Sequence, residues 1–281
     1  MKLAPNQLKG KIKSLAIKDN VDARVLMRIY MMERFLERLS FSKYQNNFII
    51  KGGILVSSMV GISCRTTMDI DTTVKCIDLN ENNILKIVNE ICEISLDDEI
   101  KFKINKLENI MDEMEYPGIR IHIDSLCGSM ITPIKIDIST GDVITPKEII
   151  YPYKLLIEDK KINLLSYNLE TILAEKTQTI LARDEANTRM RDFYDIFILN
   201  KFYKSRIDVK TFALAFKSTC ENRGTIYLLD NYRISLNRIS SSDNLNLLWM
   251  KYQEKYQYAK DISYYDIMIC LKELITLASK N

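Results

Sequence analysis

The sequence is poor in the residues on which many catalytic sites depend. Its only histidine is His122, and it has a single tryptophan, Trp249, among 281 residues. One histidine takes Ser-His-Asp and Cys-His catalytic sites, and metal sites with several histidines, out of consideration. His122 lies in a segment of alternating apolar residues, and we expect it to be structural.

A strong charge of one sign and long apolar runs are also missing. The 40 basic and 37 acidic residues leave a net charge of +3, which is too small to require a nucleic-acid partner. The lysine-rich N-terminal segment has no apolar core, and no later run approaches the ~20 apolar residues that span a bilayer. We therefore expect a cytoplasmic protein without a membrane segment.

Paired cysteines of the kind found in metal and redox motifs are absent. The six cysteines form no Cys-x-x-Cys pair, and several have apolar neighbours: Cys64, Cys76, Cys92, Cys127, Cys220 and Cys270. This usage is typical of reduced thiols in a cytosolic protein.

The apolar content, 47% of the residues, is enough for two modest domains. Helix and strand patterns are mixed up to about residue 165, and the patterns beyond it are helical. We therefore predict an α+β fold, with an α/β sheet domain and N-terminal helices at 1–165 and an α-helical domain at 166–281. No internal repeat or low-complexity linker is present.

Periodicity places the main elements of the first domain. Asp22 caps a helix over 25–39 whose apolar residues recur at spacings of three and four, so one face is buried, and charged residues lie between them. Asn80 or Asn82 caps a second amphipathic helix. Alternating isoleucines predict three strands, with a turn at Pro117-Gly118 after the first: 100–104, 119–123 and 134–138.

The most informative stretch is 48–74. An apolar strand leads to Gly52 and Gly53, a short helix follows, and a second strand carries Asp69 and Asp71 on one face. Two carboxylates held close together repel each other, and Mg²⁺, which prefers oxygen ligands, stabilises them in the ionised form. The glycines let backbone N–H groups approach an anion at the start of the helix. The stretch predicts nucleotide chemistry.

A third carboxylate is expected on a neighbouring strand, because nucleotidyl transfer uses metal ions that bridge phosphate oxygens. Asp137 lies between two isoleucines in the middle of an alternating segment. Asp124 is the alternative. We favour Asp137 because its segment alternates more cleanly.

The helical domain carries a basic pair. Lys176 and Arg183 are seven residues apart and project from one face of a helix, along which a triphosphate could lie. The alternative is a solvated basic face with Glu175 and Asp184 as partners.

An Asp-x-x-Asp pair, Asp192 and Asp195, follows. Arg189 and Arg191 precede these aspartates at spacings that intrahelical salt bridges would also explain.

Taken in order, these motifs resemble the AbiEii-type nucleotidyltransferase toxins of the DNA polymerase β-like nucleotidyltransferase superfamily. The resemblance runs from about residue 51 to residue 195. Its parts are Lys51-Gly52-Gly53, Arg65-Thr66-Thr67-x-Asp69-x-Asp71, the acid between two apolar residues at Asp137, Lys-x6-Arg at 176–183 and Asp-x-x-Asp at 192–195.

The resemblance implies a nucleotidyltransferase-type mixed-sheet domain with flanking helices, followed by the helical domain. It implies a toxin that uses Mg²⁺, with two ions expected, to transfer a nucleoside monophosphate from an NTP to an acceptor such as RNA or tRNA. The setting would be a bacterial toxin–antitoxin or phage abortive-infection system. Its cognate antitoxin would act genetically, without direct binding.

The resemblance also implies roles for individual residues. Metal binding falls to Asp69, Asp71 and Asp137. Lys176 would hold the triphosphate and Asp192 would be the essential acid of the last motif. Further nucleotide contacts fall to Gly52, Gly53, Arg65, Arg183 and Asp195. Gly53 stands where many nucleotidyltransferases have serine, which leaves Ser57 or Ser58 as substitutes.

Three other interpretations fit part of the pattern. A small hydroxylated acceptor, as in the aminoglycoside nucleotidyltransferases, would keep the fold and replace RNA. The motifs could instead belong to a non-catalytic nucleotide-binding or RNA-binding module. A metal-dependent glycosyltransferase would use Asp-x-Asp but gives no reason for the later motifs.

Aromatic residues from Trp249 to Tyr258 alternate with lysines and could stack on RNA, but a core stripe with a solvated basic face is the default.

Overall fold

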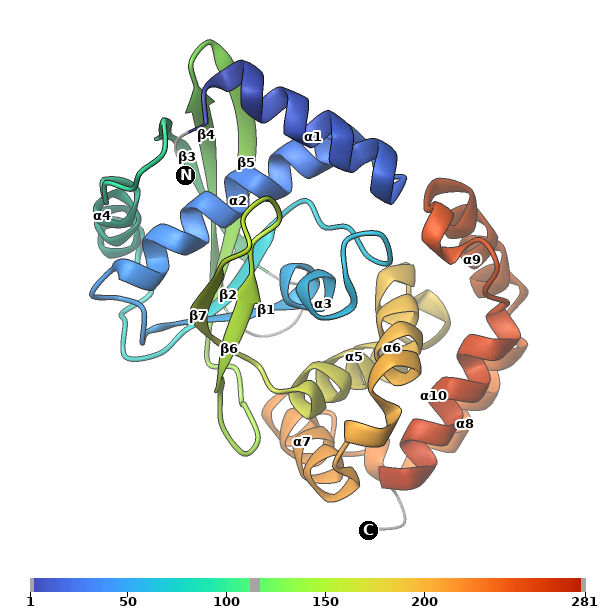
Figure 1. Cartoon of the computed structure of the whole chain (residues 1–281). Helices are drawn as coiled ribbons and strands as arrows, with labels where there is room; N and C mark the ends of the chain where they lie inside the picture. Colours follow the sequence, from blue (N-terminus) through green and yellow to red (C-terminus); the bar gives the residue numbers. More distant parts are fainter. Residues whose placement is uncertain (1–2, 112–116, 279–281) are drawn as a thin grey trace. The chain divides into compact units, whose positions relative to one another are not determined.

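The computed structural model describes residues 3–111 and 117–278 (Figure 1). The chain forms two compact units. The sheet unit comprises Met1–Asp142 and Ile149–Ser166, and the helical unit comprises Val143–Glu148 and Tyr167–Asn281. The α+β class expected from the sequence is confirmed, with one mixed sheet and flanking helices in the first unit and helices in the second.

The sheet has seven strands in the order β3-β4-β5-β2-β1-β7-β6. Strand β1 pairs in parallel with β7, and β2 pairs in parallel with β5, while the other neighbours are antiparallel. The bounds are β1 Phe48–Lys51, β2 Ile70–Val74, β3 Ile100–Met111, β4 Pro117–Cys127, β5 Met130–Thr140, β6 Ile149–Lys154 and β7 Lys161–Ser166.

The outer strands are longer than the sequence predicted. The pairing of β3 with β4 continues to Met111 opposite Pro117. The predicted turn at Pro117-Gly118 is therefore wrong in position, because both residues belong to β4, and the connection falls at 112–116, outside the described residues. The reason is the continuous cross-strand ladder, which a sequence pattern of five residues does not reveal.

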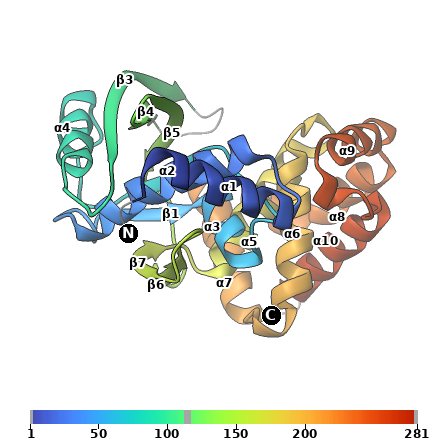
Figure 2. The same ribbon diagram turned by 45° about the horizontal axis from the view of Figure 1, so that its top comes forward.

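Four helices belong to the sheet unit. Helix α2 packs on β5 and β7, α1 packs on α2, α3 packs on β1 and β2, and α4 contacts α2 and β3 (Figures 1 and 2). The side chains of Asp22 and Asn80 cap α2 and α4, as the sequence predicted. The bounds are α1 Pro5–Asp19, α2 Ala23–Phe41, α3 Gly52–Val60 and α4 Glu81–Cys92.

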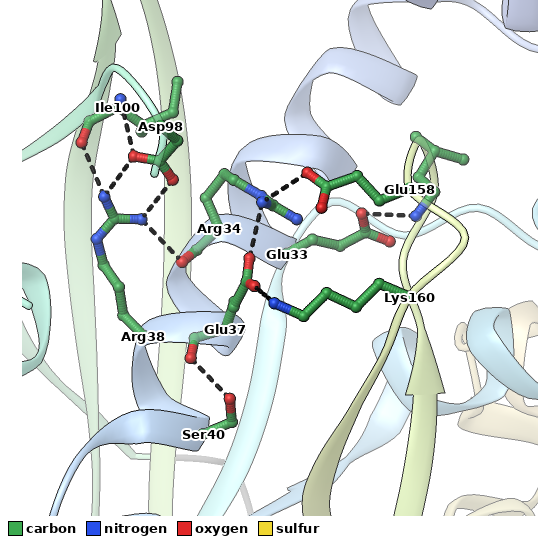
Figure 3. Close-up of polar contacts among 10 residues, drawn as sticks. Glu33, Arg34, Glu37, Arg38, Ser40, Asp98, Ile100, Glu158 and Lys160 are labelled. Carbon is green, nitrogen blue, oxygen red and sulfur yellow. Dashed lines mark hydrogen bonds and ion pairs between the residues drawn. The ribbon is translucent and has the colours of Figure 1, made fainter. Parts of the chain in front are cut away.

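Helix α2 buries its charged residues as well as its apolar ones, which differs from the single buried face expected from its periodicity. Two pairs of consecutive residues of the helix are involved, and all four side chains are at most 3% exposed: Glu33, Arg34, Glu37 and Arg38. The Arg38 guanidinium donates to both carboxylate oxygens of Asp98, at 3.0 and 2.8 Å, and to the carbonyl of Ile100 (Figure 3). These bonds attach α2 to the start of β3.

The opposite side of this charged cluster holds the turn between β6 and β7. Arg34 pairs with Glu37 at 2.7 Å and with Glu158 at 3.2 Å, and Lys160 pairs with Glu37 (Figure 3). Helix α2 is therefore fixed at both ends of the sheet by buried, paired charges. Such pairs are tolerated because the ion pairing offsets the cost of removing charge from water.

Among the residues that the structure describes, no guanidinium or ammonium group pairs with the carboxylate of Glu33. It accepts a hydrogen bond from the Leu156 N–H at 2.9 Å, and Tyr153 lies at 3.5 Å. Burial raises the pKa of Glu33 to about 8, and the hydrogen bond from Leu156 and the nearby Arg34 only partly oppose it.

The helical unit is built on α5, whose N-terminus is capped by the side chain of Asn168. The Asn168 amide donates to the carbonyls of Thr145 and Lys147, and the Thr145 N–H donates to the Thr171 hydroxyl. These bonds draw 143–148 into this unit. The bounds of its helices are α5 Leu169–Arg183, α6 Met190–Tyr203, α7 Val209–Asn222, α8 Leu228–Ser241, α9 Asp243–Lys255 and α10 Tyr264–Ala278.

The aromatic stripe of α9 belongs to the core. Trp249 is 1% exposed, its indole N–H donates to the carbonyl of Ile262, and its ring stacks with that of Tyr252.

Within 3–111 and 117–278, no helix is long and apolar enough to cross a membrane. The six cysteines are free thiols, and three are buried: Cys127, Cys220 and Cys270.

Candidate functional site

The sheet register brings four charged residues into one row. Lys51 of β1 pairs with Asp71 of β2, Asp71 with Asp137 of β5, and Asp137 with Arg120 of β4. Because side chains directly opposite each other share a face, the four project from one face of the sheet. The opposite face of β2 is apolar or buried, as its alternation predicted.

The two glycines lie directly against Asp71. Gly52 has φ +60°, and a Cβ at this position would be 2.1 Å from Asp71 Oδ2. The Gly53 N–H donates to the same oxygen at 3.1 Å. The N–H group that we expected to meet an anion thus meets the protein's own carboxylate, and only glycine permits so close an approach. Residues 18 apart in sequence therefore form one compact site.

Asp71 carries more negative charge around it than its neighbours compensate. Its pKa is raised to about 6, first by burial and then by the charges of Asp69 and Asp137, while the Gly53 N–H and Lys51 act in the opposite direction. A divalent cation would relieve this repulsion, so the donor chemistry of Asp69 and Asp71 fits such an ion. No group of three acidic, histidine or cysteine residues in the described part of the chain converges to hold one.

Asp137 is already engaged by a cation. Arg120 Nε and Nη2 donate to its two carboxylate oxygens at 2.7 and 2.6 Å, a bidentate pair. Asp124, the alternative third acid, lies opposite Pro133, four positions along β5 from Asp137. The structure thus places Asp137, and not Asp124, beside Asp71.

Arg120 and Asp142 are additions that the sequence analysis missed. Lys51 Nζ lies 2.5 Å from Asp142 Oδ2, and the Ser139 hydroxyl donates to the same oxygen. Burial raises the pKa of Asp142, but Lys51 and the hydrogen bonds outweigh burial and leave it below the ordinary value. The polar alternation of β4 pointed to Arg120, but only the strand register shows which acid it meets.

The segment between α3 and β2 supports the glycines. Thr67 Oγ1 lies 3.3 Å from both the carbonyl oxygen and Oδ1 of Asp69, and a Cβ on Gly53 would be 2.7 Å from that hydroxyl. Arg65 is 2% exposed and its Nη2 would be 3.3 Å from the same Cβ. Both residues therefore pack behind the glycine turn.

The two serines considered as substitutes for a motif serine have structural partners. The buried Ser57 hydroxyl donates to the Arg65 carbonyl at 2.5 Å, and Ser58 Oγ lies 3.1 Å from the Tyr151 hydroxyl. Both contacts anchor α3 within the sheet unit.

In the helical unit, Lys176 meets both aspartates of the Asp-x-x-Asp pair. Its Nζ lies 2.7 Å from Asp192 Oδ1 and 2.7 Å from Asp195 Oδ2. Burial lowers the pKa of Lys176, but the two carboxylates outweigh burial and raise it above its ordinary value. This cluster joins α5 to α6 and brings together three of the residues predicted from the sequence.

Arg183 lies two turns along α5 and is half-buried. The acids considered as surface partners for the basic pair have other contacts: Glu175 pairs with Arg223 at 3.0 Å, and Asp184 pairs with Arg238. Lys176 is therefore not part of a solvated basic face. Its side chain is 12% exposed.

His122 lies on β4 of the sheet unit, two residues from Arg120. Its Nε2 lies 2.9 Å from Glu108 Oε1, and in register it stands opposite Lys135 of β5. It projects from the same polar face as Arg120 because the two are two residues apart.

The chain was compared with protein families and solved structures. The family model described as "Nucleotidyl transferase AbiEii toxin, Type IV TA system" matches residues 34–266. JHP933 from Helicobacter pylori is 15% identical, with a TM-score of 0.48, over 92% of this chain and 93% of that one. An antigenic nucleotidyltransferase-like protein from Paracoccidioides brasiliensis is 14% identical, with a TM-score of 0.35, over 85% and 95%. No curated protein matches.

Proposed function

Because the chain belongs to the AbiEii family of nucleotidyl transferase toxins of type IV toxin–antitoxin systems, we propose that it transfers a nucleoside monophosphate from an NTP to an RNA acceptor of the tRNA class. In this reaction an acceptor hydroxyl oxygen bonds to the α-phosphorus of the NTP, and pyrophosphate and a proton are released. We further propose that it acts in phage defence and that its antitoxin counteracts it without direct contact.

The observation that carries this proposal is the half-buried Asp71 beside Asp69, in contact with the Gly53 N–H. A raised carboxyl pKa at a cluster of like charges marks a position where the protein keeps uncompensated charge, and such positions concentrate at functional sites. Asp69 and Asp71 would hold Mg²⁺, with Asp137 completing the set. The ion, when bound, would neutralise charge on the phosphate oxygens during transfer.

The residues of the chain have separate tasks in this scheme. Gly52 and Gly53 fix Asp71 by their close approach, and Thr67 and Arg65 pack behind them. Arg120 orients the carboxylate of Asp137 through its bidentate pair. Lys176, held by Asp192 and Asp195, supplies the triphosphate contact of the family pattern, and Arg183 supports it.

The test is incubation of the purified protein with Mg²⁺, each of the four α-labelled NTPs and total bacterial RNA, followed by a denaturing gel. Label should appear on RNA of tRNA size, and Asp69→Ala should abolish it without loss of folding. Lys176→Ala should also abolish it, with a loss of stability because Asp192 and the buried Asp195 lose their shared cation. The matched control is Asp124→Ala. Asp124 is an acid on the same sheet face but outside the row of Lys51, Asp71, Asp137 and Arg120, which we call the carboxylate row. The Asp124→Ala variant should still label the RNA.

Other outcomes separate the alternatives. A labelled small molecule distinct from the NTP and its hydrolysis products would point to a small hydroxylated acceptor. Metal-dependent NTP binding with no transfer to any acceptor would overturn the enzyme proposal and leave a nucleotide-binding module. Loss of label on addition of EDTA, with recovery on addition of Mg²⁺, would establish the metal dependence.

A further inference from the structure

Basic residues line the polar face of β3, β4 and β5 beside the carboxylate row. In register, Lys135 stands opposite His122, and Lys103 and Lys101 of β3 stand opposite Asp124 and Leu126 of β4. These positions alternate in step with Arg120 and Asp137, so they share that face. The Lys135 position is two residues from Asp137, about 7 Å along the strand.

A β-bulge in β3 adds one more lysine to this face. The pairing passes from Ile104 opposite Ile123 to Lys106 opposite His122, so that Asn105 has no partner. In an uninterrupted strand, Lys106 would share the apolar side of Phe102 and Ile104. The bulge instead turns Lys106 to the side of Lys103, which is the kind of change in direction that bulges produce.

The lysines have little internal compensation. Across residues 3–111 and 117–278, the ammonium groups of Lys101, Lys103 and Lys135 make no ion pair or hydrogen bond. Glu108 pairs with Lys106 at 2.5 Å and with His122 at 2.9 Å. The other acid of this face outside the carboxylate row is Asp124. Three lysine charges thus remain available for an anionic partner.

The face is accessible within the sheet unit. Helix α2, through Phe35, packs against Phe102 on the other side of β3. Lys101, Lys103 and Lys106 are exposed. A groove of about 580 Å³ between β3 and α4 has Lys103 and Lys106 in its lining, together with Asn82, Asn89, Asn105 and the acid Glu81.

We propose that this lysine face, Lys101, Lys103, Lys106 and Lys135, binds the sugar–phosphate backbone of the RNA acceptor next to the end that receives the nucleotide. The inference rests on the proposed function. The row of phosphates on a polynucleotide complements the three unpaired lysines of this face, Lys101, Lys103 and Lys135, and contacts of this kind position a nucleic acid without reading its sequence. The lysine face thereby explains how an acceptor is retained beside Asp71.

The test compares two double variants with the same change in charge. Lys103→Glu with Lys135→Glu reverses the charge at two positions of the lysine face. Lys13→Glu with Lys18→Glu reverses the charge of two exposed lysines of α1, which packs on α2. The first pair should raise the KM for total tRNA about tenfold and leave the KM for NTP and the melting temperature unchanged. The α1 pair should leave all three unchanged.

The salt dependence gives a second readout. Each lost phosphate contact lowers the slope of log affinity against log salt by about 0.7 for a single strand, so two contacts lower it by about 1.4. If charge reversal disturbs folding, the neutral double variant Lys103→Gln with Lys135→Gln takes its place. It should give the same change in slope. If the Lys103/Lys135 variants have the same KM for RNA and the same salt slope as the Lys13/Lys18 variant, the inference is overturned while the transfer activity stands. Absence of RNA labelling by the wild type would overturn the proposed function first.

Discussion

At the scale of single residues, Asp71 is held in a position that costs the fold stability. It is half-buried, it lies near the charges of Asp69 and Asp137, and its pKa is raised to about 6 from 3.8. Between these two values the folded protein retains a proton that the unfolded chain has lost, so the metal-free protein loses stability as pH rises through this interval. A neutral side chain of the same shape removes the repulsion.

We therefore predict that Asp71→Asn abolishes transfer and raises stability. The amide oxygen can still accept from the Gly53 N–H, while the charge is gone. In EDTA at pH 8, the free energy of unfolding should rise by about 1–3 kcal/mol, because one pKa unit corresponds to about 1.4 kcal/mol. Urea denaturation measures it. Asp124→Asn, on the same sheet face, should change little, and a destabilised Asp71→Asn would contradict the burial argument.

The residues of the site were partly foreseeable from the sequence. Gly52, Gly53, Asp69 and Asp71 are close in the chain and follow from local patterns, and the family resemblance that they supported is confirmed. Arg120 and Asp142 were not foreseen, because their contacts depend on strand register. A strand pattern gives the face of a side chain but not its partner across the ladder.

At the scale of elements, helix α2 shows a second limit of sequence patterns. Its spacing gave the cap and the apolar side, but the burial of its charges depends on Asp98 and on the turn between β6 and β7 (Figure 3). These partners come from segments 60 or more residues away. No helical periodicity could have indicated them, because a charged position reads as solvated unless its partner is known.

We predict a pH dependence from Glu33 of this helix. Its pKa is about 8 in the fold against an ordinary 4.5, so the folded protein keeps a proton that the unfolded chain loses above pH 4.5. Its contribution is therefore full below about pH 4.5 and is lost as pH rises toward 8. The groups facing it are Arg34, Glu158, Tyr153 and the Leu156 N–H.

Glu33→Gln should remove this dependence and raise the free energy of unfolding at pH 8 by a few kcal/mol. Denaturation at pH 5 and at pH 8 measures the difference. The exposed Glu254→Gln on α9 serves as the control. Equal slopes of stability against pH for wild type and Glu33→Gln would count against a neutral Glu33.

A second element-scale prediction concerns the bidentate pair of Arg38 and Asp98. Both side chains are 3% exposed. Arg38→Met leaves Asp98 buried without its cation, which should cost about 3–5 kcal/mol in the free energy of unfolding.

The pair of Arg24 and Asp22 is the matched surface case, with Arg24 95% exposed. Arg24→Met should cost less than about 1 kcal/mol. Adding Asp98→Leu to Arg38→Met should restore much of the lost stability, since neither charge of this buried pair remains. Additive costs of Arg38→Met and Asp98→Leu in thermal melts would show that the two side chains are not coupled.

At the scale of the whole molecule, the chain passes between the units three times, at 142–143, 148–149 and 166–167. The sequence indicated a single boundary near residue 165. The sequence pattern did not reveal that 143–148 belongs to the helical unit. This segment is held by hydrogen bonds of the Asn168 amide and the Thr171 hydroxyl and not by an apolar stripe.

We predict that 143–148 stabilises the helical unit. A fragment that joins 143–148 to 167–281 through a glycine–serine linker should unfold at a higher temperature than 167–281 alone, by an amount equivalent to about 1–3 kcal/mol for the regained hydrogen bonds. Melting followed by circular dichroism measures this. A version with 143–148 in scrambled order is the control, and equal melting of all three would contradict the assignment.

The contact between Gly53 and Thr67 has a consequence for how such sequences can change over time. The Thr67 hydroxyl fills the space that a side chain at position 53 would need. A serine cannot enter there by one substitution without displacing Thr67, whereas a serine at 53 with alanine at 67 keeps one hydroxyl in the same place. Evolution between the two forms would therefore proceed by paired exchange, and related chains with serine at the first position should carry a smaller residue at the second.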